Sequence, residues 1–237
     1  MSPLRNANRE TLEAKRRISR HQRLSPDDLI RRRLVVRTDG REEWLPPVCD
    51  PSRMPVPAEV WIRLSTPDPQ ARSGPSEPAW DPGDWLRSAV DRWADRRLEV
   101  YFVSFDPAPL RAGFFDRVRL LSDRNLRWQT KLLTDGKNLT STAVLDQVLR
   151  SKLDEVYVYV AGLGEPSANG RVLDAVKDLV DLRVARGQNL PKIICRLCPG
   201  SPGSSRCVTE ITQWVKQAGV DRLEITDKET EEKRLWA

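Results

Sequence analysis

From residue 60 onward, the chain alternates short apolar runs with longer amphipathic segments. Six runs of five to eight residues are rich in β-branched and aromatic side chains, as buried strands are: 60–65, 98–105, 127–133, 155–160, 192–197 and 222–226. Between them, five segments repeat apolar residues about every 3.6 positions, as helices with one buried face do: 84–96, 113–124, 141–152, 170–186 and 209–218. This alternation predicts an α/β fold with a parallel sheet of right-handed βαβ units. An open doubly wound sheet and a partial barrel both fit the pattern.

Several predicted helices carry capping residues at their ends. Asp84 and Ser141 are predicted N-caps, because their side-chain oxygens can accept hydrogen bonds from N–H groups of the first turn. Asn125, Gly187 and Gly219 are predicted stops, because these residue types adopt the left-handed conformation that ends many helices.

The N-terminal region differs in composition from the rest of the chain. Residues 1–37 hold eleven arginines and lysines but only four acidic residues. Helices are expected over 10–23 and from Ser25 toward Arg33, which gives a basic helical arm. Five prolines between residues 44 and 57 indicate an extended linker, because proline fixes φ and lacks a backbone donor. The expected organisation is an arm (1–43), a Pro-rich linker (44–57), a core domain (58–227) and a charged tail (228–237).

Charge and hydropathy narrow the classes of function. The chain has 237 residues and a net charge of +6, and no apolar stretch approaches the roughly 18 residues of a membrane span. The start of the chain has no apolar signal-peptide region, so a cytoplasmic location with reduced cysteines is expected. The basic arm can contact nucleic-acid phosphates or an acidic protein. No aromatic side chain lies among its arginines to stack on bases, which favours a protein partner over nucleic acid.

The loop after the first predicted core strand resembles a known cofactor-binding loop. Residues 66–76 read T-P-D-P-Q-A-R-S-G-P-S. The radical S-adenosylmethionine (radical SAM) enzymes carry T-x-x-C-N-x-x-C-x-x-C after their first barrel strand. Pro69, Ser73 and Ser76 fall on the three cysteines of that motif. Since thiolates hold iron–sulfur clusters, the resemblance implies a related barrel that has lost its cluster.

Other loops extend this resemblance over residues 58–226, in the family's order. Residues 133–140 (L-T-D-G-K-N-L-T) resemble the threonine-asparagine-glycine turn, and residues 217–225 resemble the last helix and strand. The family's glycine-glycine-glutamate-proline loop, which holds the amine of S-adenosylmethionine, is represented by Asp106, Pro107, Ala108 and Pro109. Both glycines and the acid are therefore replaced. The resemblance implies a partial (β/α)6 barrel of the radical SAM type, with no bound cofactor.

Four residues are predicted to line the barrel mouth, because loops after parallel strands gather at the carboxyl edge of a sheet. They are Arg63, Asp135, Glu165 and Arg196. Arg63 and Arg196 lie inside apolar strands, where a charge needs a partner, and Asp106 and Glu165 are the candidate acids. Asp135 stands in a Thr-Asp-Gly sequence, which also favours a role as a turn former.

The four cysteines are candidate metal ligands. Cys195 and Cys198 form a CxxC motif, and Cys207 and Cys49 are the other two thiols. Four thiolates can hold zinc or a relocated cluster. However, a zinc ribbon needs two CxxC motifs, and Cys195 falls on the apolar face of its strand, as buried structural cysteines do. No metal is therefore predicted.

Seven of the eight tryptophans fall into two groups. Core positions on strand and helix faces are expected for Trp61, Trp85, Trp93 and Trp128. The linker, a loop and the C-terminal tail are expected to hold Trp44, Trp80 and Trp236. Tryptophans in such irregular segments often serve as interface anchors.

Taken with the resemblance, these features imply a pseudoenzyme: a cluster-less radical SAM-like protein that binds a protein partner, such as an active radical SAM enzyme, or a peptide substrate. One alternative is an enzyme of another class that uses the barrel mouth with a cysteine-bound metal or S-adenosylmethionine. The other alternative is a nucleic-acid-binding protein that uses the basic arm.

Overall fold

The sheet and the helices were traced in a computed structural model of the chain. The structure describes residues 33–37, 40–45, 56–64, 82–105, 112–123, 127–139, 141–161, 166–198 and 205–226. All of them belong to one compact unit, which begins at residue 32. In these ranges no helix is both long enough and apolar enough to cross a membrane.

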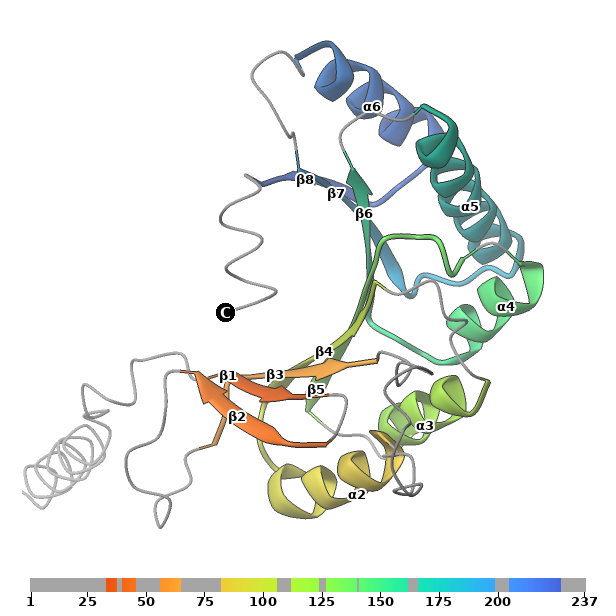
Figure 1. The fold of residues 1–237 in the computed structure, drawn as a ribbon. Helices are drawn as coiled ribbons and strands as arrows, with labels where there is room; N and C mark the ends of the chain where they lie inside the picture. Colours follow the sequence, from red (N-terminus) through yellow and green to blue (C-terminus); the bar gives the residue numbers. More distant parts are fainter. Residues whose placement is uncertain are drawn as a thin grey trace, which may run out of the picture. The chain divides into compact units, whose positions relative to one another are not determined.

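The described strands form a single sheet in the order β2-β1-β3-β4-β5-β6-β7-β8 (Figure 1). Their bounds are β1 Arg33–Val36, β2 Glu42–Leu45, β3 Glu59–Arg63, β4 Leu98–Ser104, β5 Trp128–Thr134, β6 Glu155–Ala161, β7 Lys192–Cys198 and β8 Arg222–Ile225. The helices between them are α2 Pro82–Trp93, α3 Ala112–Asp123, α4 Thr142–Arg150, α5 Pro166–Ala185 and α6 Ser205–Ala218. The six strands and five helices predicted from periodicity are thus confirmed, with ends that shift by a few residues.

From β3 to β8, every strand is parallel to its neighbour and follows it in the chain. Right-handed connections in an unbroken strand order place every crossover helix on the same side of a sheet. Helices α2 to α6 accordingly lie on one face, here called the outer face (Figure 1). A doubly wound sheet reverses its order at a switch point between parallel strands, and no such reversal occurs from β3 to β8.

The two faces of the sheet bury different side chains because strand residues alternate between them. On the outer face, residues such as Ile62, Phe102 and Leu132 pack against the helices in a large apolar core. The four predicted core tryptophans are all buried. The opposite face, here called the inner face, buries a smaller cluster that includes Trp61 and Tyr101.

Local capping sets where three helices begin or end. Ser141 is confirmed as an N-cap, since its Oγ accepts a hydrogen bond from the Val144 N–H at 3.3 Å. Gly187 and Gly219 follow the last residues of α5 and α6 with φ of 62° and 74°, the left-handed conformation that glycine adopts without strain. The prediction for Asp84 was wrong. Helix α2 begins at Pro82, so Asp84 lies in its first turn, and Asn125 lies outside the described residues.

The expected boundary between arm, linker and core was also wrong. Residues 33–36 form β1, which pairs in parallel with β3, and residues 42–45 form β2, which pairs with β1 as a hairpin. The apolar run that forms β1 is short and flanked by arginines, so the basic composition of the segment obscures the strand pattern. Trp44, expected as a linker anchor, lies in β2 and packs against the outer core. Residues 1–32, 227–237, Trp80 and Trp236 lie outside the described residues.

Helix α2 holds the β1–β2 hairpin through one carboxylate. Glu42 of β2 accepts a hydrogen bond from the Trp85 indole at 2.9 Å and one from Arg92 at 3.2 Å. A hairpin alone is marginally stable in water. Its attachment to both β3 and α2 therefore makes residues 33–45 part of the core unit.

Candidate functional site

A ladder of charged and aromatic side chains crosses the inner face of the sheet. It is built from strand positions of one parity, because every second residue of a strand points to the same face. The register brings Tyr101 of β4, Lys131 of β5 and Glu155 of β6 into neighbouring positions. We call the whole set the inner network: Arg33, Glu59, Trp61, Glu99, Tyr101, Lys131, Glu155, Tyr157, Tyr159, Arg196, Arg222 and Glu224.

Lys131 stands at the centre of this network. Its Nζ lies 3.0 Å from a Glu99 oxygen and 3.5 Å from a Glu155 oxygen, and the residue is 8% exposed. The hydroxyl of Tyr101 donates to Glu99 at 2.6 Å, and the hydroxyl of Tyr157 donates to Glu155 at 2.9 Å. Burial raises the pKa of Tyr157 to about 12, and the hydrogen bond to Glu155 adds to this shift. The carboxylates of Glu99 and Glu155 thus share one buried ammonium group, and each also accepts a hydrogen bond from a tyrosine hydroxyl.

Arg196 forms the second centre, nearer the carboxyl edge. Its Nε donates to Glu224 at 3.0 Å and its Nη1 donates to the Tyr159 hydroxyl at 2.7 Å. The guanidinium also lies 4.5 Å from the ring centroid of Tyr157. The side chain is 3% exposed, so these contacts replace water around the charge. Arg222 donates to the Tyr157 hydroxyl at 3.2 Å and so joins the arginine and lysine centres.

An aromatic stack extends the network to the first strands. The Trp61 and Tyr101 rings are stacked, with centroids 4.5 Å apart and planes 14° apart. The guanidinium of Arg33 lies 4.4 Å from the Trp61 ring, and Glu59 accepts a hydrogen bond from the Trp61 indole at 3.2 Å. Strands β1 and β3 to β8 are therefore linked across the inner face by side chains as well as by their backbones.

Of the predicted mouth residues, Arg196 is held in the inner network. It pairs with Glu224, which the sequence did not single out, whereas the expected acids Asp106 and Glu165 lie outside the described residues. Arg63 is the last residue of β3 and is half-buried. Burial lowers its pKa, and the charge of Arg37 lowers it further.

Asp135 is a turn residue, as its sequence context indicated. One of its oxygens accepts a hydrogen bond from the Lys137 backbone at 3.2 Å, and the other pairs with the Lys137 ammonium at 2.8 Å. The hydrogen bond that the Lys137 ammonium donates to Asp135 raises the pKa of Lys137. Gly136 has a φ of 79°, and a Cβ at that position would lie 2.6 Å from Val172 Cγ1. The turn therefore requires glycine both for its backbone conformation and for space.

The expected cofactor loops are outside the described residues. These are the positions Pro69, Ser73 and Ser76, and the run Asp106, Pro107, Ala108 and Pro109. The strands that they follow, β3 and β4, are both described.

The CxxC motif lies within one strand, which weakens the case for a metal site. Cys195 and Cys198 both belong to β7, and two positions three apart in a strand fall on opposite faces. Cys195 is buried in the outer core, where burial raises the pKa of its thiol to about 12 and so disfavours the thiolate that binds metals. The described residues hold no cluster of three or more His, Cys, Asp or Glu side chains that suits a metal ion. Cys49 and the side chains of Cys198 and Cys207 lie outside this description.

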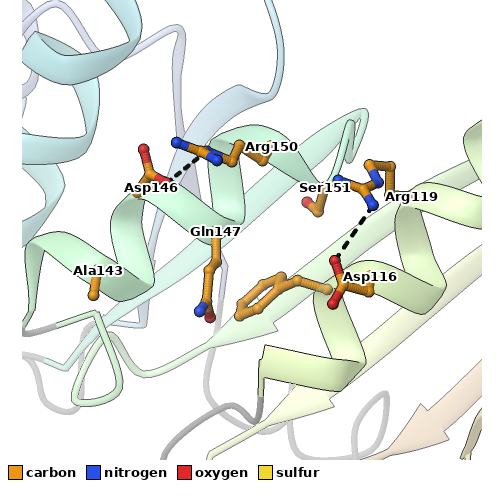
Figure 2. Close-up of a pocket in the computed structure, with 8 residues that line it drawn as sticks. Asp116, Arg119, Ala143, Asp146, Gln147, Arg150 and Ser151 are labelled. Carbon is orange, nitrogen blue, oxygen red and sulfur yellow. Dashed lines mark ion pairs between the residues drawn. The ribbon is translucent and has the colours of Figure 1, made fainter.

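A hollow of about 290 Å³ lies on the other side of the sheet, between α3 and α4 (Figure 2). We call it the α3–α4 groove, and its lining residues are Phe115, Asp116, Arg119, Ala143, Asp146, Gln147, Arg150 and Ser151. It shares no residue with the inner network.

Comparisons with protein families, with curated proteins and with solved structures returned no match. Function therefore rests on the chemistry of the inner network, the groove and the loops that the sequence resemblance identified.

Proposed function

We propose that this chain is a partial (β/α)6 barrel of the radical SAM type that has lost its cluster, and that it acts in the cytoplasm as a non-catalytic subunit binding a protein partner or a peptide substrate. The fold supports the barrel. Six parallel strands, β3 to β8, follow one another in chain order with five helices on one face, and the sheet curves toward its inner face (Figure 1).

The positions of the resembling motifs support the family. Residues 66–76 follow β3, residues 106–109 follow β4, and the Thr-Asp-Gly turn follows β5. Each motif thus comes after the carboxyl end of the strand that the resemblance requires, which is the edge where ligands bind in parallel sheets. The first of these loops supplies a proline and two serines where three thiolates are needed.

The inner network is the observation that carries the non-catalytic role. General acids, bases and nucleophiles need a group that substrate can reach and that is poised to exchange a proton or a bond. Here Lys131 and Arg196 are each held by carboxylates and tyrosine hydroxyls, and both are buried. The inner face is therefore used to hold strands together. We therefore assign partner binding to the loops or to the outer surface of the protein.

The experiment is anaerobic reconstitution with iron and sulfide, with a designed gain of function beside it. The natural chain should stay colourless and hold less than stoichiometric iron. The triple variant Pro69→Cys, Ser73→Cys, Ser76→Cys should take up iron and turn brown, because it restores three thiolates at the positions that the resemblance assigns.

Two results would count against the proposal. A brown natural chain whose colour is lost in Cys198→Ala would favour the alternative of a relocated metal site. A triple variant that binds no more iron than the natural chain would show that residues 66–76 are not a former cluster loop. Calorimetry with S-adenosylmethionine adds an independent check, since the replaced amine loop predicts weak binding or none, and micromolar binding would contradict it.

A further inference from the structure

Strand β8 forms one end of the described sheet (Figure 1). It pairs with β7 along one edge, and among the described strands none pairs with its other edge. An edge strand presents a row of backbone N–H and C=O groups that can bond a further strand. The sequence of β8, Arg-Leu-Glu-Ile, has no proline that would remove a donor from this row. The edge of β8 can therefore accept another strand.

The side chains of β8 divide between the two faces of the sheet. Arg222 and Glu224 lie on the inner face, where their side chains pair at 2.8 Å, and the Arg222 side chain is 51% exposed. Leu223 and Ile225 have the opposite parity and so lie on the outer face. Leu223 packs in part against the outer core, whereas Ile225 is 53% exposed. The unpaired edge is thus bordered by an exposed charge on one face and an exposed apolar side chain on the other.

The sequence of β8 is complementary to itself in an antiparallel pair. If two copies join through β8 with their inner faces on the same side, a register centred on Leu223 places Arg222 of each copy opposite Glu224 of the other. Opposite charges in such cross-strand positions stabilise an antiparallel pair, and like charges destabilise it. Registers centred on Arg222 or on Glu224 would instead bring like charges together.

The outer face favours the same register. Leu223 lies opposite its counterpart, and Ile225 lies diagonal to Leu223 of the second copy, a spacing that long side chains can bridge. The pairing therefore covers the exposed Ile225 side chain with apolar surface.

The other edge of the sheet lacks this complementarity. Strand β2 reads Glu-Glu-Trp-Leu and contains no basic residue to place opposite its glutamates. Pairing of β8 with β2 of another copy would use two different surfaces and would grow into a filament or a ring, whereas pairing of β8 with itself closes at two copies.

We propose that two copies of this chain associate through antiparallel pairing of β8, centred on Leu223, so that the two sheets continue into one. The strands have only four residues each, so their contact is small compared with the roughly 1,200–2,000 Å² of a stable interface. A weak dimer is therefore expected, with a dissociation constant on the order of 100 μM. The proposal goes beyond the function proposed above and uses neither the cluster loop nor a partner protein.

Sedimentation velocity of the full chain between about 5 and 500 μM tests the association. The natural chain should shift from monomer toward dimer over this range. Arg222→Glu should raise the dissociation constant by about tenfold or more, because two attractive cross-strand pairs become repulsive. The matched control Arg87→Glu reverses an exposed charge on α2 and should change it by less than about twofold. Circular dichroism checks the fold of each variant, and Arg222→Gln serves if the charge reversal disturbs the inner network.

Cross-linking tests the register independently of charge. In Leu223→Cys the two introduced thiols lie directly opposite each other, with Cα atoms about 4.5–5.5 Å apart, a spacing that a disulfide can bridge. Mild oxidation should therefore yield a covalent dimer. Ile225→Cys is the control, because its two thiols would be about 14 Å apart along the strands. The natural chain gives the background from its own four cysteines.

A natural chain that stays monomeric up to about 500 μM would overturn the proposal. So would a dimer that Arg222→Glu leaves unchanged, or equal cross-linking of Leu223→Cys and Ile225→Cys, since either result would place the contact elsewhere. None of these outcomes depends on whether iron binds at residues 66–76, so the two proposals fail separately.

Discussion

Replacing Lys131 by methionine is the sharpest test of the inner network. Methionine keeps the length and much of the volume of lysine but removes the charge that Glu99 and Glu155 share at 3.0 and 3.5 Å. In this variant the Glu99 and Glu155 carboxylates, from the strands on either side, flank an uncharged residue. Their repulsion and their incomplete hydration should then oppose folding.

The expected cost follows from burial. Removing one partner of a buried ion pair costs about 3–5 kcal/mol. The Lys131 side chain is 10% exposed, whereas both glutamates are 25% exposed and keep some hydration, so the lower end of that range, about 3 kcal/mol, is expected. For a domain of this size, such a loss lowers the melting temperature by roughly 6–12 °C.

The assay is urea unfolding followed by far-UV circular dichroism, with the natural chain, Lys131→Met and Glu99→Gln/Lys131→Met/Glu155→Gln compared at pH 7. The triple variant should regain most of the lost stability, because it removes the two carboxylates that the single variant leaves without their cation. A loss below about 1 kcal/mol in the single variant would place Lys131 in the class of weak surface pairs and refute the reasoning. A triple variant as unstable as the single one would show that packing, and not charge, is responsible.

Three further outcomes are expected. Gly136→Ala should cost about 2–4 kcal/mol in urea unfolding, because the residue needs a positive φ and a Cβ would meet Val172, whereas Gly170→Ala on the open face of α5 should be neutral or stabilising. Burial raises the pKa of Asp221, but hydrogen bonds from Ile193 and Arg183 and nearby positive charge lower it more. Its contribution to stability should therefore be present above about pH 4 and be lost as the pH falls, a dependence that Asp221→Asn should weaken in melting curves. Deleting residues 1–31 should leave the melting temperature almost unchanged, whereas deleting residues 1–45 should abolish cooperative unfolding because it removes β1 and its buried apolar side chains.

The regular part of the fold was accessible from the sequence because each element carries its own periodicity. The strand Leu98–Ser104 and the helix Ser205–Ala218 were found to within a few residues from patterns that depend on no distant part of the chain. The hairpin Arg33–Leu45 was missed for the opposite reason. Its strands are four residues long, and what makes them strands is pairing with β3 and the contact of Glu42 with α2. Neither of these long-range contacts can be recognised in a short stretch of sequence.

The inner network was less predictable than the fold, because its residues are brought into contact only by the order and register of the strands. Arg196 was noticed as a charge in an apolar strand, but its partner Glu224 lies 28 residues later and looks like an ordinary polar residue near the end of the chain. Lys131 and Glu155 likewise carry no local signal in the sequence. Parallel pairing with a known register is needed to see that they lie side by side.

Once the strand order is known, a regular pattern of charge is seen in five residues of the inner face. From β4 to β8 the strands contribute in turn Glu99, Lys131, Glu155, Arg196 and Glu224, and the signs of these five charges alternate. Strand β8 also carries Arg222, which pairs with Glu224 at 2.8 Å. Parallel strands with similar apolar patterns can pair in wrong orders, and opposite charges on neighbouring strands penalise such exchanges because like charges would then meet. Lys131 opposite Glu155 and Arg196 opposite Glu224 are direct register partners. The inner network thus joins neighbouring strands of the inner face by pairs of opposite charge, which favour the observed strand order.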